Sequence, residues 1–109
     1  MKNLEMSYLM DFYGNLLRDK QREIMQMYYQ EDLSLSEIAS EFGITRQGVR
    51  DNIVRAEKEL TNYEISLGLW KKFSRISENL GRIRTLVEEQ DNDASAEIIK
   101  LIDEVENDI

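Results

Sequence analysis

Apolar residues in the middle of the chain recur at alternating spacings of four and three, and the whole chain of 109 residues contains no proline. This spacing is the seven-residue repeat of a long helix that buries one face. The repeat consists of Val49, Ile53, Ala56, Leu60, Tyr63 and Leu67. Without proline nothing obliges a helix to break, and the helix-favouring residues Glu, Leu, Lys, Arg and Ile are common. The sequence therefore predicts an all-α fold.

The residue types on which many enzymes rely are missing, because the chain has no cysteine and no histidine. Disulfides, thiolate nucleophiles, thiolate metal sites and the commonest general base are therefore excluded. No nucleotide-binding glycine motif occurs, and residues 91–102 lack the glycine and the final glutamate of a calcium-binding loop. We expect a protein that is not an enzyme, with no metal ion and no cofactor.

The length fits one small domain, or a compact domain with a helical extension. Unbroken apolar runs do not exceed three residues, and no basic segment precedes a hydrophobic stretch near the N-terminus. Neither a membrane span nor a secretory signal is expected, so we predict a cytoplasmic protein.

Charge is distributed unevenly along the chain, whose formal net charge is −8. Residues 1–87 sum to zero, whereas residues 88–109 sum to −8. The neutral part includes a basic stretch formed by Lys71, Lys72, Arg75, Arg82 and Arg84. The acidic tail has two interpretations. It is either a solvated face, or a segment that repels nucleic acid or covers the basic stretch until a partner displaces it.

Local signals predict where the helices begin and end. We expect helices over about 4–17, 20–30, 35–42 and 46–67, followed by two helical segments beyond Gly68. The first should turn inward Leu9, Phe12, Tyr13 and Leu16, and the last Ile98, Leu101, Ile102 and Val105. We predict a helix-turn-helix domain over residues 1–68 and a helical extension with an acidic tail over residues 69–109.

Capping signals support these boundaries. Ser34 and Glu37 form a capping box before the third helix, Gly43 ends that helix, and Thr45 caps the fourth. Asp19 is the expected cap of the second helix, and one of residues 91–93 is the expected cap of the last.

Residues 35–53 have the spacing of a helix-turn-helix. Ala39 is small where the second helix must approach closely, and Gly43, four positions later, permits a turn of about three residues. Apolar residues follow that glycine by one and six positions, at Ile44 and Val49. The pattern predicts a helix-turn-helix core of winged-helix-like or sigma type, with a long C-terminal helical extension.

Polar residues remain on the outward face of the fourth helix. A helix in the major groove reads bases with its N-terminal residues, where Arg suits guanine and Gln suits adenine. The candidates are Thr45, Arg46, Gln47, Arg50 and Asp51, with Arg55 and Lys58 within reach of backbone phosphates. The alternative is that these are ordinary exposed residues, an interpretation that the carboxylates of Asp51, Glu57 and Glu59 favour.

Residues 10–17, 19–21 and 33–53 resemble the YlxM family, small bacterial helix-turn-helix proteins encoded beside genes of the signal recognition particle. Within residues 8–67, where the resemblance lies, 46–47, 51–53 and 63–64 match the family pattern, whereas Gly48 replaces a usual Ala and Arg50 a usual Tyr. The core is also similar to the promoter-reading domain of bacterial sigma factors. The resemblance implies a regulatory role or a role in the signal recognition particle pathway.

Two functions follow. The first is a DNA-binding regulator that forms a homodimer, because one short recognition helix rarely gives enough affinity alone. Its dimer surface would be the stripe Leu60, Tyr63, Leu67, Trp70, Phe73, Ile76, Leu80 and Ile83, unless that stripe packs within the chain. The second is an interaction module that uses the motif as a scaffold. It would bind a signal recognition particle component, with the basic stretch on RNA phosphates.

Overall fold

The computed structural model describes residues 4–109, in which the chain forms two compact units. The first unit ends at Trp70 and the second runs from Lys71 to Ile109, whereas the sequence prediction divided the chain after Gly68. Every regular element within residues 4–109 is a helix. The all-α prediction is confirmed.

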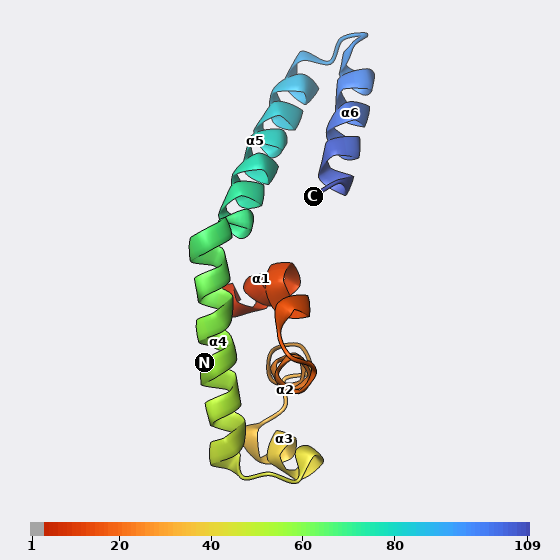
Figure 1. Ribbon diagram of the computed structural model, residues 1–109. Coiled ribbons are helices and arrows are strands. Elements are labelled where there is room, and N and C mark those ends of the chain that lie inside the picture. Colours follow the sequence, from red (N-terminus) through yellow and green to blue (C-terminus); the bar gives the residue numbers. More distant parts are fainter. Residues whose placement is uncertain (1–3) are drawn as a thin grey trace. The chain divides into compact units, whose positions relative to one another are not determined.

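The first unit packs its helices against one long helix, α4 (Figure 1). Its elements are α1 (Leu4–Tyr13), the 3-10 helix η1 (Gly14–Leu16), α2 (Asp19–Tyr29), α3 (Leu35–Phe42) and α4 (Arg46–Leu67). Helices α1, α2 and α3 each contact α4. The shared core consists of Leu9, Met10, Tyr13, Leu17, Ile24, Met25, Ile38, Ala39, Val49, Ile53, Ala56 and Leu60. Burying these side chains fixes which face of α4 stays outside.

The helix ends in this unit are determined by capping side chains and glycines that lie at those ends. The Ser34 hydroxyl accepts the Glu37 backbone N–H at 3.1 Å, and the Glu37 carboxylate accepts the Ser34 N–H at 3.1 Å. Gly43 and Gly68 end α3 and α4 in the left-handed conformation, with φ of 63° and 62°. The predicted capping box and both predicted helix ends are confirmed.

The first helix is shorter than predicted. Helix α1 ends at Tyr13 and the chain tightens into η1, which has fewer residues per turn and so rotates the side chains that follow. As a result Leu17 is buried and Leu16 is 56% exposed, so the predicted inward position of Leu16 is wrong. Asp19 is the first residue of α2 rather than its cap, because Arg18 holds the cap position without a side-chain hydrogen bond.

Side chains of the first unit cap the start of α5 (Leu69–Gln90). The Tyr13 hydroxyl donates to Glu64 Oε1 at 2.7 Å and accepts the Leu69 N–H at 3.0 Å, while Glu64 Oε1 accepts the Trp70 N–H at 3.1 Å. The Trp70 ring stacks on Tyr8 with 5.6 Å between centroids. Burial, aided by the hydrogen bond to Glu64, raises the pKa of Tyr13. Two N–H groups that a helix start leaves unpaired are thus satisfied.

The second unit is a helical hairpin formed by α5 and α6 (Ser95–Asn107) (Figure 1). At its turn Asp91 is left-handed, with φ of 40°, and the Asn92 side chain accepts the Ala94 N–H at 2.9 Å. The Ser95 hydroxyl accepts the Asn92 N–H at 2.9 Å and donates to the Val87 carbonyl at 3.3 Å. Ala94 occupies the cap position of α6, so the predicted cap within residues 91–93 is wrong.

Packing inside this hairpin is sparse. Ile102 is its one buried hydrophobic side chain, whereas Ile98, Leu101 and Val105, which were predicted to turn inward with it, are exposed. Arg84 pairs with Asp103 at 2.5 Å and with Glu106 at 3.2 Å. No helix among residues 4–109 combines the length and the apolar character needed to cross a membrane.

Candidate nucleic-acid interface

The start of α4 is fixed by a turn and a cap. The Ile44 N–H donates to the Ala39 carbonyl at 3.1 Å, which closes the turn around Gly43. The Thr45 hydroxyl then accepts the Gly48 N–H at 2.9 Å, so the predicted cap is confirmed. A Cβ atom on Gly48 would lie 3.2 Å from that hydroxyl, which is tight. Glycine at this position therefore leaves room for the cap.

Helix α4 has an inner and an outer face. Val49, Ile53, Ala56 and Leu60 bury the inner face in the core. The structure brings all the predicted contact residues to the exposed surface: Thr45, Arg46, Gln47, Arg50, Asp51, Arg55 and Lys58. The helix is thus held from one side while its polar side chains remain accessible on the other, as groove binding requires.

Two of these residues are already bonded to each other. Gln47 Nε2 donates to Asp51 Oδ1 at 2.9 Å, one turn further along the helix. An amide nitrogen has two hydrogens, so the second hydrogen and the amide oxygen are still available to an adenine edge. Asp51, whose charge alone would repel phosphate, can therefore act by orienting the Gln47 amide.

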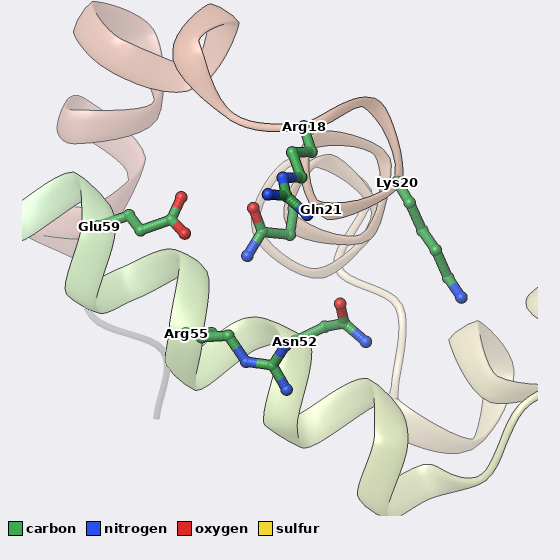
Figure 2. Close-up of a pocket in the computed structure, with 6 residues that line it drawn as sticks. All are labelled: Arg18, Lys20, Gln21, Asn52, Arg55 and Glu59. Carbon is green, nitrogen blue, oxygen red and sulfur yellow. The ribbon is translucent and has the colours of Figure 1, made fainter.

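A polar pocket of about 480 Å³ borders α4 on the side of α2 (Figure 2). It is lined by Arg18, Lys20 and Gln21 from α2 and its cap, and by Asn52, Arg55 and Glu59 from α4. Gln21 is 7% exposed, and its Oε1 is buried with no hydrogen-bond partner. Asn52 is held in place, since its Nδ2 donates to the Gly48 carbonyl at 2.8 Å. The sequence analysis identified Arg55 as a candidate contact residue, but it did not identify the other lining residues as parts of a site.

The family described as "Putative helix-turn-helix protein, YlxM / p13 like" matches residues 1–105. The chain belongs to this family. It is 45% identical over 105 residues to the UPF0122 protein BH2485 of Halalkalibacterium halodurans, which covers 96% of this chain and 94% of that protein. It is 46% identical over 84 residues to a UPF0122 protein of Desulforamulus reducens, a match that covers 77% of this chain and 72% of that protein. It is 40% identical over 107 residues to a UPF0122 protein of Bacillus thuringiensis, a match that covers 96% of this chain and 97% of that protein.

The predicted resemblance to the YlxM family is confirmed, and the match reaches well beyond residues 8–67. The family match therefore includes most of the helical extension, which lies outside the resemblance predicted from the sequence. The helix-turn-helix core with its long helical extension agrees with the predicted fold class.

One apolar residue on the outer face of α4 escaped the sequence analysis. Val54 is 55% exposed, and it lies four positions after Arg50 and seven after Gln47. These spacings place it on the same face of a helix. An exposed valine there can contact a thymine methyl group. The helical spacing alone could have revealed it.

The basic stretch of the second unit is only partly available. Lys71, Lys72, Arg75 and Arg82 are exposed, while the ion pairs of Arg84 with Asp103 and Glu106 raise the pKa of its guanidinium. The acidic tail therefore pairs with the basic stretch at Arg84. In the predicted apolar stripe, Leu60 is buried in the first unit, whereas Leu67 and Ile83 are exposed and the other members are partly buried. No cluster of metal-binding side chains occurs in the described part of the chain.

Proposed function

We propose that this YlxM/p13-like protein is a DNA-binding regulatory protein that places the first turns of α4 in the major groove. The observation that carries this proposal is the two-sided character of α4. Its inner face is fixed in the core and its start is capped by Thr45, while its outer face exposes polar side chains. A helix held in this way can enter a groove without losing its own support.

In this proposal different side chains serve different parts of the duplex. Arg46 and Arg50 suit the acceptors of guanine, and Gln47, oriented by Asp51, suits adenine. Lys58 and Arg55 lie further along the helix, where they would contact phosphates and set the register.

We further propose that the protein acts as a dimer. One helix-turn-helix reads few base pairs, and a second copy adds a second half-site and therefore affinity. In the stripe named above, each unit by itself exposes an apolar side chain that a second copy could cover, since Leu67 of the first unit is 55% exposed and Ile83 of the second is 43% exposed. Sedimentation equilibrium tests this point, with dimer mass expected for the natural chain and a lower dimer fraction for Leu67→Glu, Ile83→Glu. A monomer at concentrations that saturate DNA would contradict it.

The experiment that tests DNA reading is selection of bound duplexes from a random library, followed by titration of the selected and a scrambled duplex. We expect enrichment of one sequence pattern, and loss of the preference in Arg46→Ala, Gln47→Ala. Arg22→Ala removes one positive charge elsewhere in the same unit and is the matched control. Recovery of no pattern, or an unchanged preference in the double variant, would contradict the proposal.

A second candidate function is an accessory role with RNA or a protein of the signal recognition particle. The exposed cations of α5 favour it, as does the balance of four acidic and four basic residues over 45–68. A binding assay with signal recognition particle RNA and protein at low salt tests this candidate. Binding that is lost in Lys71→Gln, Lys72→Gln would support it, and absence of binding would reject it.

A further inference from the structure

We propose that the pocket between α2 and α4 holds a phosphate of the DNA backbone, on the strand that borders the recognition helix. This inference rests on the proposed function and extends it, because it makes α2 a second contact element. The pocket's members outside the predicted contact surface are Arg18, Lys20, Gln21, Asn52 and Glu59.

The charges of the pocket suit an anion. Arg18, Lys20 and Arg55 bring three positive charges against the single carboxylate of Glu59. The pocket also lies at the N-terminus of α2, an 11-residue helix whose cap residue makes no side-chain hydrogen bond. The unpaired N–H groups and the dipole of such a helix end favour a bound phosphate. The nearby Asp19 carboxylate pairs with Arg22 at 3.1 Å, so its charge is partly neutralised.

Gln21 provides an observation that points to a bound ligand independently of the charges and the helix end. A buried carbonyl oxygen without a donor is costly, and Gln21 Oε1 is such an atom in the free protein. Figure 2 shows its amide pointing into the space between the helices, among the side chains of Arg18, Glu59 and Arg55. A guanidinium has five N–H donors in a fork. An arginine drawn in by a phosphate can therefore donate to the phosphate and to Gln21 at once, which makes Gln21 a positioning residue.

The position of the pocket beside α4 suits contact with the DNA backbone at the edge of the major groove. An α-helix turns by about 100° per residue, so Arg55 lies between the outward Asp51 and the α2-facing Asn52. The pocket thus opens on the flank of α4 rather than on its outer face. The backbone strands lie on the flanks of a helix that occupies the major groove, whereas the bases lie opposite its outer face.

Salt-dependent titration of a selected duplex tests the phosphate contact. Removal of one phosphate contact weakens binding about tenfold near 0.1 M salt and lowers the slope of log K against log salt by about one. We expect this result for Arg18→Gln. The control Lys100→Gln removes the same charge from an exposed position of α6 outside the pocket, and it should change neither quantity by more than a small amount.

The role of Gln21 has a separate signature. Gln21→Met removes the unpaired oxygen at similar volume, so we expect the free protein to melt at a higher temperature and yet to bind DNA several-fold more weakly. The binding loss should be smaller when Arg18 is already Gln, because the two residues act together. Unchanged binding by Gln21→Met, or additive losses in the double variant, would overturn this role.

The outcomes separate this inference from the proposed function. If Arg18→Gln matches Lys100→Gln while Arg46→Ala, Gln47→Ala abolishes the sequence preference, the pocket is rejected and DNA reading stands. If the natural chain binds no duplex at low salt, both are rejected. The pocket is supported if the slope of log K against log salt falls by about one in Arg18→Gln and stays unchanged in the control variant.

Discussion

The two units of the chain are both helical, but they are stabilised in different ways. Among residues 4–109, all but one of the buried hydrophobic side chains belong to the first unit, and Ile102 alone belongs to the second. The first unit combines that core with a capping box, the Thr45 cap of α4 and the hydrogen bonds of Tyr13 and Glu64. The second unit relies on Ile102, the Ser95 turn and the ion pairs of Arg84.

This difference indicates how stability relates to function in the chain. Buried apolar area is the main source of stability, so the first unit should open only by global unfolding. The hairpin, with little buried area and exposed ion pairs, should open at a lower free energy. The surface proposed to read DNA therefore lies on the stable part, and the acidic tail on the part that opens more easily.

Truncation in the core of the first unit should have the largest effect. Leu60 is fully buried between α4 and the other helices, so Leu60→Ala should lower the free energy of unfolding by about 2–5 kcal/mol. Urea titration followed by circular dichroism measures this loss. Val54→Ala, on the exposed face of the same helix, is the control. A loss below about 1 kcal/mol for Leu60→Ala would contradict the claim that the buried core is the main source of stability in the first unit.

Removal of the Tyr13 hydroxyl should have the next largest effect. Tyr13→Phe leaves the Leu69 N–H without its acceptor and removes one donor to Glu64, which should cost about 1–3 kcal/mol. Tyr8→Phe keeps the ring that stacks on Trp70 and serves as the matched control. Equal stability of the two variants in urea titration would show that the buried hydroxyl does not stabilise the start of α5.

Alkaline pH should weaken the first unit through two tyrosines. Burial raises the pKa of Tyr29 above its usual value of about 10, and a hydrogen bond to Glu57 raises it further. The pKa of Tyr13 is raised as well. Because folding raises both values, their contribution to stability is complete below about pH 10 and is lost as the pH rises through the folded pKa values.

Tyrosinate absorbance against pH measures this effect, with stability followed in parallel. Glu57→Gln removes the carboxylate charge and should lower the pKa of Tyr29 toward its usual value. If the absorbance of the natural chain fits five tyrosines that all ionise near pH 10 while the fold persists, the prediction is wrong.

Truncation in the hairpin should have the smallest effect on the first unit. Ile102→Ala should raise amide hydrogen exchange throughout α6 and leave exchange in α1–α4 unchanged, because the buried residues of the first core all belong to the first unit. Leu101→Ala, at an exposed position of the same helix, is the control. Faster exchange in α4 of the Ile102 variant would show that the two units share stability after all.

The sequence predicts the helix-turn-helix better than the elements around it, because its signals are local. Ser34 with Glu37, Gly43 and Thr45 each act on backbone groups within three or four residues, and all four behave as predicted. The end of α1 was missed, since Tyr13 there packs and bonds with residues about fifty positions away.

The candidate site likewise has one part that local sequence predicts and one part that depends on residues far apart in the chain. The outward residues of α4 follow from helical periodicity, which any one helix displays. The pocket beside it joins Gln21 to Asn52, Arg55 and Glu59, which are more than thirty residues away in the chain. Periodicity places each residue on its own helix, but it does not say which flank of α4 meets α2. That relation depends on packing.

A mobility titration of the natural chain on a selected and a scrambled duplex, at about 50 and 200 mM salt, tests the central claim most directly. The account predicts tight binding to the selected duplex that survives the higher salt, and binding to the scrambled duplex that weakens steeply. Equal and weak binding to both duplexes at both salt concentrations would contradict it, and would leave the helix-turn-helix as a scaffold for other partners.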